Sequence, residues 1–146
     1  MSSRPFIVRG YSMQPTLSPG DHVLVDQHAY IRTSPSRCDL VLIRSPDEKR
    51  LMLKRVVGLP NEHVAYKDGW LMIDGEHLRE PYLGGLPASL GLDGWGFDLE
   101  EGQYLVLGDN RARSTDTRQF GPVDSSHIIG PAWLRYWPFE SYGPVG

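Results

Sequence analysis

The sequence predicts a mainly β fold of short antiparallel strands with little helix. The 146-residue chain contains 16 glycines and 12 prolines, which disfavour long helices and suit a chain with many turns. Its uninterrupted apolar runs are never longer than four residues. Several of these runs face each other across short polar turns, as the strands of β-hairpins do.

Length and composition are those of one globular unit, so we expect residues 1–146 to form a single domain. The net charge of −3 predicts no general attraction to nucleic acid. Cys38 is the sole cysteine, which excludes an intrachain disulfide. The five histidines are not at metal-ligand spacing, so we expect neither a metal nor another cofactor.

No stretch approaches the ~20 apolar residues of a spanning helix or the roughly 7–15 of a secretory signal. We therefore expect no transmembrane segment or export signal in this chain, and a location in the cytoplasm or at the periphery of a membrane.

Strands are expected near residues 6–8, 22–26, 39–43, 51–57, 62–66, 70–73, 104–107 and 128–137. Two hairpins follow, 39–43 with 51–57 and 62–66 with 70–73, the second closed by Asp68-Gly69. The last strand is expected to break at Gly130-Pro131. The glycine-rich stretch 83–103 is either a mobile lid or a plain long connection.

Three stretches carry residues that could take part in catalysis. Gly10 to Leu17 is a Gly/Pro loop that could hold Ser12 rigidly, although most such serines only shape a turn. Lys54 lies in the middle of an apolar strand. It is either a solubilising residue at an edge or, if it is buried, a lysine whose lowered pKa makes it a usable general base.

The third stretch runs from Gly108 to Gly121 and reads GDNRARSTDTRQFG. Carboxylates and arginines placed this densely can pair and hold a loop in one shape. The alternative is a well-bonded turn without chemistry.

Together these stretches resemble the type I signal peptidase family, serine proteases that use a Ser/Lys dyad. GYSMQPTL at 10–17 is similar to the nucleophile box of that family, KRVVGLP at 54–60 to its base box, and the 108–121 stretch to its third box. The resemblance extends over nearly the whole chain, to Trp137-Pro138. It implies a signal-peptidase-like β-barrel or sandwich, in an anchorless short form.

The resemblance implies a role for each site residue. Ser12 would be the nucleophile, its N–H an oxyanion donor, and Lys54 the general base. Ser114 would orient the Lys54 amine, with Asp116 and Arg118 paired behind it. Met13 and Leu53 would wall the pocket for the residue before the cut.

Some positions depart from the family pattern. Gly10 stands where many relatives carry an oxyanion-hole serine, so the second donor would be backbone or water. Cys38 and Asn61 replace frequent glycines, which could shift turns, and Thr117 replaces a frequent serine. The N-terminal membrane anchor usual in the family is absent from the sequence.

The expected function is endoproteolytic removal of a leader or signal peptide after small residues, with the preprotein bound extended. A dedicated protease for one soluble protein, such as nickel-type superoxide dismutase, is an alternative. So is a non-catalytic peptide-binding β module. A Ser-His-Asp hydrolase would need a histidine in a motif, and a self-cleaving repressor-type protein would need a cleavage site before Ser12.

Aromatic residues gather near the end of the chain. We expect them to pack a small core, and the alternative is a peripheral contact with a membrane. They are Trp133, Tyr136, Trp137, Phe139 and Tyr142.

Overall fold

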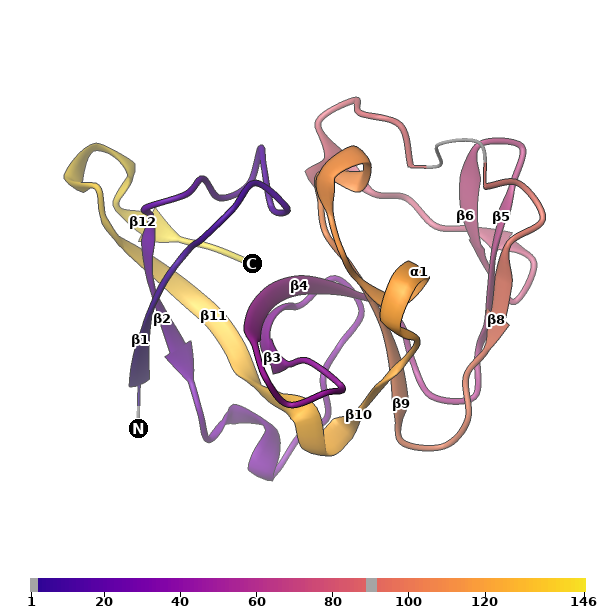
Figure 1. Cartoon of the computed structure of the whole chain (residues 1–146), viewed down its shortest axis with the longest axis horizontal. Coiled ribbons are helices and arrows are strands. Elements are labelled where there is room, and N and C mark those ends of the chain that lie inside the picture. The colour runs from indigo at the N-terminus through magenta and orange to yellow at the C-terminus, as the bar shows by residue number, and fades with distance from the viewer. Residues whose placement is uncertain (1–2, 89–91) are drawn as a thin grey trace.

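The computed structural model describes residues 3–88 and 92–146, and within them the chain forms two antiparallel sheets (Figure 1). The strands are β1 Ser3–Ile7, β2 His22–Asp26, β3 Leu40–Arg44, β4 Leu51–Gly58, β5 His63–Lys67, β6 Trp70–Ile73, β7 Glu76–His77, β8 Gly96–Asp98, β9 Gln103–Leu107, β10 Val123–Asp124, β11 Ile128–Trp137 and β12 Gly143–Pro144. The helices are α1 Thr117–Phe120 and the single-turn 3₁₀ segments η1 Ala29–Ile31, η2 Pro81–Leu83, η3 Arg111–Arg113, η4 Ser125–His127 and η5 Phe139–Ser141.

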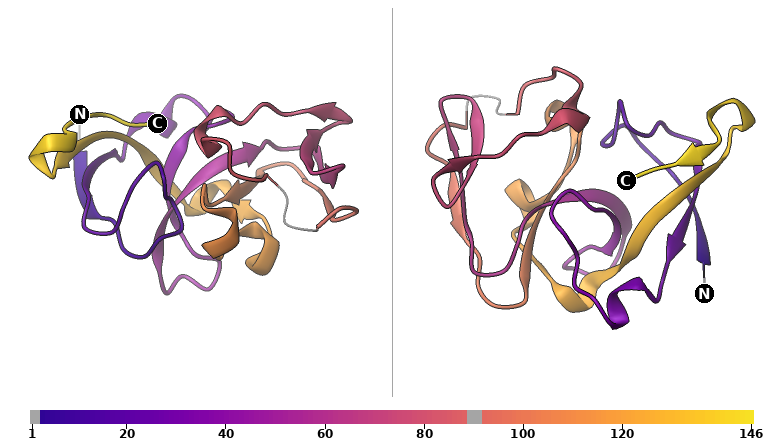
Figure 2. Two further views of the ribbon diagram at one scale, coloured as in Figure 1. Left: turned by 90° about the horizontal axis from the view of Figure 1, so that it is seen from above. Right: turned by 180° about the vertical axis from the view of Figure 1, so that it is seen from behind.

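The larger sheet has the strand order β1-β2-β11-β3-β4-β9-β10, with β12 paired to β11. It curls on itself at one side of the molecule, while the smaller sheet, β7-β6-β5-β8, lies at the other (Figure 1). Views from above and from behind show the same two lobes side by side (Figure 2). β9 continues into the segment that carries α1, so the 108–121 stretch lies where the lobes meet.

Alternating burial explains why these segments form half-buried strands. Along β2 every second side chain is fully buried, and β5 and β6 follow the same period-two pattern. The first four residues of β3 are all buried, as expected of a strand in the middle of a sheet. Apolar clusters therefore fill the inside of each lobe.

The two predicted hairpins are confirmed. β3 pairs with β4, and β5 pairs with β6 across Asp68-Gly69. Both turn residues have positive φ, 52° and 84°, which matches the type I′ turn that Asp-Gly favours. Cys38 and Asn61 also take positive φ, 73° and 68°, so these two turns keep the left-handed backbone that glycine would adopt.

Three expectations need correction. β11 runs unbroken through Gly130-Pro131, because a register shift between Ile128 and Gly130 absorbs the irregularity. The 83–103 stretch is not a plain connection throughout, since residues 96–98 form β8 and pair with β5. Residues 89–91 of that stretch lie outside the described residues.

The third correction concerns the C-terminal aromatic residues, which do not pack a core. Trp137 is 52 % exposed, Phe139 78 % and Tyr142 62 %. They lie at the end of β11, in η5 and directly after η5, on the turn between β11 and β12 that projects from the larger sheet (Figure 1). Across the described residues, no helix has the length and apolar content that crossing a membrane requires.

Candidate active site

The loop that carries Ser12 is closed at its base and anchored in the core. Val8 N–H donates to Asp21 O at 2.8 Å, and Gly20 N–H donates to Val8 O at 2.8 Å. Gly10 has a φ of 73°, a backbone conformation that L side chains rarely adopt. Met13 and Leu17 are buried beneath the loop, so Ser12 is presented from a fixed backbone.

Lys54 is almost completely buried, with 1 % of the residue exposed. Its amine donates to Ser114 Oγ at 3.1 Å. Burial is the main cause that lowers the Lys54 pKa from 10.5 to about 8. The cations of Arg118 and Arg50 lower it further, against the opposing charges of Asp116 and Asp109. The amine is therefore substantially neutral in mildly alkaline solution.

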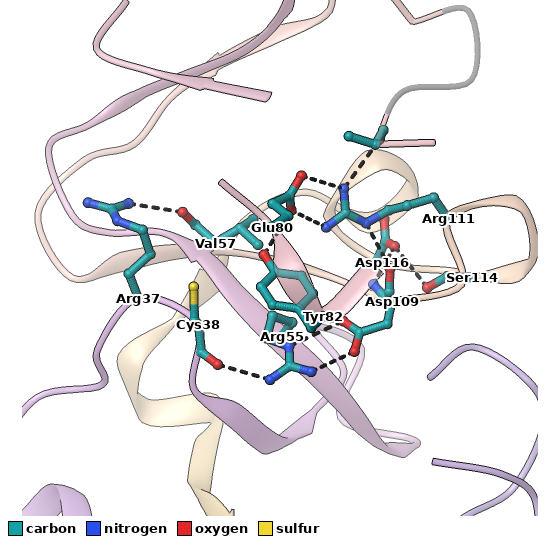
Figure 3. A network of polar contacts seen from close by, with 12 residues as sticks. Arg37, Cys38, Arg55, Val57, Glu80, Tyr82, Asp109, Arg111, Ser114 and Asp116 are labelled. Carbon is teal, nitrogen blue, oxygen red and sulfur yellow. Dashed lines mark hydrogen bonds and ion pairs between the residues drawn. The ribbon is translucent and has the colours of Figure 1, made fainter. Parts of the chain in front are cut away.

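Asp116 is the centre of the turn behind Lys54. Its carboxylate accepts the Ser114 hydroxyl at 2.8 Å and Gly108 N–H at 2.9 Å, the first of which Figure 3 shows. Arg118 forms a two-point ion pair with it, at 2.9 and 2.8 Å. Burial alone would raise the Asp116 pKa, but Arg118 and these hydrogen bonds outweigh burial and hold the pKa below its ordinary value. The carboxylate stays charged and fixes the Ser114 hydroxyl.

The same turn also holds the backbone of the loop that carries Ser12. Asn110 N–H donates to Ser12 O at 2.9 Å, and its side-chain amide donates to Tyr11 O at 3.1 Å. A Cβ on Gly108 would lie 2.1 Å from Ser114 Oγ and 2.6 Å from Ser12 O. Glycine is therefore required where this turn passes between Ser12 and Ser114.

A buried ion pair between Arg55 and Asp109 supports the turn from the other side (Figure 3). Arg55 donates to Asp109 through Nε and NH2, at 3.2 and 2.6 Å, and to Cys38 O at 3.1 Å. Its guanidinium carbon lies 4.3 Å from the centre of the Tyr82 ring. Thr16, in the loop that carries Ser12, donates its hydroxyl to the same carboxylate, so Asp109 joins that loop to β4.

A second buried pair, Arg111 with Glu80, ties the turn to the segment after β7 (Figure 3). Arg111 also donates to Gly108 O at 2.9 Å and to Ala88 O at 3.2 Å. Tyr82 donates its hydroxyl to Glu80 at 2.8 Å. The turn is thus fixed by charge-assisted bonds to both lobes.

Ser12, Met13, Leu53 and Lys54 open onto one groove of about 520 Å³. Its walls are the end of β1 and the first half of β4. In the described chain no hydrogen bond joins Ser12 Oγ to Lys54 Nζ, and the amine bonds Ser114 instead. Catalytic hydrogen bonds often tighten only when substrate is bound, so this geometry is compatible with a dyad. Among the residues described, no group of three His, Cys, Asp or Glu side chains could hold a metal ion.

The structure thus brings every site residue expected from the sequence to one place. Sequence reasoning missed three supports, namely the hydrogen bonds from Asn110 to the loop that carries Ser12, the Glu80–Arg111 pair and the close approach at Gly108. The signal for Asn110 and Gly108 was their place in the GDNR run. Nothing in the sequence pairs Glu80 with Arg111, which lies 31 positions later.

Comparisons with known proteins agree with this geometry. The family model for signal peptidase, peptidase S26, matches residues 1–137. Signal peptidase I of Bacillus caldolyticus is 38 % identical, with 94 % of this chain and 81 % of the relative covered. Signal peptidase I V of Bacillus subtilis is 39 % identical, with 84 % and 79 % covered.

A crystal structure of a signal peptidase I from Enterococcus faecalis superposes with a TM-score of 0.58 at 34 % identity. The match covers 68 % of this chain and 97 % of the neighbour. Three findings agree: the family model matches most of the chain, the relatives are 38 % and 39 % identical, and the solved structure shares the β architecture. The chain belongs to the signal peptidase, peptidase S26, family and is a signal-peptidase-I-like serine endopeptidase.

Proposed function

We propose that Ser12 and Lys54 form the catalytic dyad of this endopeptidase. The observation that supports it best is the buried Lys54 amine, with a pKa lowered to about 8, in the groove onto which Ser12 opens. Lys54 takes the proton of Ser12 Oγ as this oxygen attacks the scissile carbonyl. The protonated amine then gives that proton to the leaving amine. Lys54 next activates the water that hydrolyses the acyl-enzyme ester.

The other site residues hold this dyad in place. Ser114 accepts one N–H of Lys54 and so directs the amine lone pair, while Asp116 and Arg118 keep Ser114 in position. Ser12 N–H donates to the oxyanion. The second oxyanion donor is a backbone group or a water, because Gly10 has no side chain to supply one.

The substrate is a leader or signal peptide bound in extended form between β1 and β4. Main-chain hydrogen bonds to a strand edge hold it, as in β-strand addition. Met13 and Leu53 wall the pocket for the residue before the cut. Both side chains are buried and bulky, so the pocket is shallow and accepts Ala, Gly or Ser.

A peptide library with one residue varied before the scissile bond, read by mass spectrometry, tests this proposal. Wild-type protein should cut after small residues and refuse Phe, Leu and Lys. Ser12→Ala and Lys54→Ala should each lower kcat by about 10³-fold or more. Circular dichroism should show both variants folded. Near-wild-type turnover in Lys54→Ala would remove lysine as the base.

We also propose a peripheral membrane contact through the aromatic turn at 137–142. Support comes from the exposure of Trp137, Phe139 and Tyr142 on one turn, since such side chains favour the membrane interface. Co-sedimentation with phosphatidylglycerol vesicles should fall when Phe139 and Trp137 are replaced by serine. In buffer without lipid, these variants should cleave peptides as fast as wild-type protein does. A strict lipid requirement for cleavage by wild-type protein would show that catalysis itself, and not only the location of the protein, depends on the membrane.

A further inference from the structure

The groove beside Ser12 and Lys54 carries two arginines on its apolar walls. Arg9 follows β1 on one wall, and Arg50 precedes β4 on the other. Both are exposed, and within the described residues neither takes part in an ion pair. None of the described residues that line the groove is acidic.

The two buried carboxylates nearest the dyad are already paired with other arginines. Asp116 is committed to Arg118 and Asp109 to Arg55, each in a buried ion pair. Asp47, in the exposed turn before Arg50, has its pKa lowered chiefly by the Ser45 hydroxyl and Lys49 N–H that it accepts, with a smaller contribution from the charge of Arg50. Among the described residues no ion pair joins Asp47 to Arg50, so this exposed carboxylate offsets the Arg50 charge only in part. A cationic groove on a chain of net charge −3 is a local feature and does not reflect composition.

The place of Arg50 along β4 sets which part of a substrate it would meet. Lys54 lies at the cut, and Leu53, next to it, walls the pocket for the preceding substrate residue. Arg50 is four positions before Lys54, which is about 13 Å along an extended strand. In an extended peptide beside β4, the residues at about the second to fifth positions before the cut would therefore lie towards Arg50 and Arg9.

We propose that the groove selects peptides that carry an acidic side chain in this stretch, held by Arg9 and Arg50. The inference rests on the proposed function, because it places the scissile bond at Ser12. The apolar walls would accept small or aliphatic neighbours, while the two guanidiniums meet an Asp or Glu carboxylate with charge-assisted hydrogen bonds. The substrate class is thus a leader with a small residue before the cut and an acidic residue shortly upstream.

Matched peptides test the proposal. Each has Ala before the cut and either Glu, Gln or Lys at one of the second to fifth positions before it. At pH 9, where Lys54 is largely neutral, wild-type kcat/KM should be about threefold to tenfold higher for Glu than for Gln in at least one position, mainly through a lower KM. Lys should be the poorest of the three. The Glu preference should shrink as the salt concentration rises from about 0.05 to about 0.5 M, because this rise shortens the electrostatic screening length about threefold.

Variants locate the source of the preference. In Arg9→Gln/Arg50→Gln the Glu/Gln ratio should fall to about one, and in Arg50→Glu the Lys peptide should gain on the Glu peptide. A ratio taken within one variant cancels any effect of Arg50 on the Lys54 pKa. Arg32→Gln removes the same charge from an exposed site at the end of η1, outside the groove lining, and should keep the wild-type ratio.

The outcomes separate this inference from the proposed function. If no peptide with a small residue before the cut is cleaved, the proposed function fails. If Glu and Gln peptides are cleaved equally well by wild type, the function stands and the acidic specificity is wrong. A Glu preference that survives in the double variant also overturns the assignment, because its source then lies elsewhere.

Discussion

The amine of Lys54 donates to Ser114 Oγ at 3.1 Å, and the Ser114 hydroxyl donates to Asp116 at 2.8 Å. The order of donors matters chemically. A neutral amine that gives one N–H to Ser114 keeps its lone pair free, and in the proposed dyad that lone pair accepts the Ser12 proton. Asp116 fixes the Ser114 hydroxyl as an acceptor towards Lys54, so the carboxylate acts on the base through one intervening hydroxyl.

The first prediction concerns the pH dependence of cleavage. Only neutral Lys54 accepts a proton, and its pKa is about 8, so kcat/KM should rise with pH and level off above about 9. Below the pKa the rate should fall about tenfold for each pH unit. Initial rates on a neutral peptide between pH 6 and 10 measure this limb.

Ser114→Ala is the companion variant. It removes an orienting hydrogen bond and leaves the proton acceptor, so activity should drop by about tenfold to a hundredfold while the rising limb persists. A rate that is flat from pH 6 to 10 in wild-type protein would contradict the role of Lys54 as the base.

The second prediction concerns the stability cost of the buried base. The folded-state pKa of Lys54 is lowered from 10.5 to about 8, so the folded protein binds its proton less tightly than the unfolded chain does. The resulting cost is fully present below pH 8, declines between pH 8 and 10.5 and is absent above. Lys54→Met should therefore raise the free energy of unfolding at pH 7 by up to about 3 kcal/mol.

Urea unfolding at pH 7 and at pH 11 checks this. The gain should be largest at pH 7 and should vanish at pH 11, where the lysine is neutral in both states. Lys49→Met, in the exposed turn between β3 and β4, is the matched control and should change stability by less than about 0.5 kcal/mol at both pH values. A loss of stability in Lys54→Met at pH 7 would show that its contacts outweigh the burial of its charge.

The third prediction concerns the close approach at Gly108. A methyl group there would collide with Ser114 Oγ at 2.1 Å and Ser12 O at 2.6 Å. The first atom is the acceptor of the Lys54 amine, and the second belongs to the backbone of the proposed nucleophile. Gly108→Ala should lower kcat at least about a hundredfold and destabilise the fold by about 1–3 kcal/mol. Peptide cleavage and thermal unfolding measure the two effects.

Gly96→Ala is the control for this substitution. The nearest atoms to a Cβ at Gly96, in β8 of the smaller sheet, lie at 3.4 Å, so the methyl group fits. It should leave kcat unchanged. Equal activity in Gly108→Ala and Gly96→Ala would mean that the turn can move without harm to the dyad.

Local patterns in the sequence were enough to predict much of this architecture. Asp68-Gly69 predicts its hairpin because the required turn is local. The apolar neighbours of Lys54 left open whether it lies at an edge or in the core, and the structure shows it buried. The continuity of β11 through Gly130-Pro131 could not be predicted. It depends on a register shift in the pairing of β11 with β3, and β3 is distant in the sequence. The pairing of residues 96–98 with β5 is also non-local, and glycine-rich composition hides it.

The candidate site shows the same division. The roles expected of Ser12, Lys54 and Ser114 could be predicted from the sequence motifs that contain them. The ion pair of Glu80 and Arg111 could not, because it depends on how the two lobes meet. The aromatic residues were misassigned because hydrophobicity alone does not distinguish a core side chain from one on a projecting turn such as Phe139.

The last prediction concerns the buried pair of Glu80 and Arg111. Their side chains are 3 % and 1 % exposed, so removing one charge leaves the other without its partner in a site that excludes water. Glu80→Gln keeps the shape of the side chain but removes its charge. The amide then presents to the Arg111 guanidinium either its NH₂ group, which cannot accept a hydrogen bond, or its carbonyl oxygen, which is a weaker acceptor than a carboxylate oxygen. The free energy of unfolding should fall by about 3–5 kcal/mol.

Urea denaturation of Glu80→Gln measures this loss, with Glu76→Gln in exposed β7 as the control that should change stability by less than about 0.5 kcal/mol. Arg111 also bonds Gly108 O and lies in the segment that holds Ser12 and Ser114, so kcat should fall in Glu80→Gln while the KM of a short peptide changes little. A variant that unfolds at the wild-type urea concentration and keeps its kcat would show that the pair is dispensable. In that case the Asp109–Arg55 pair would be left as the buried support of the turn.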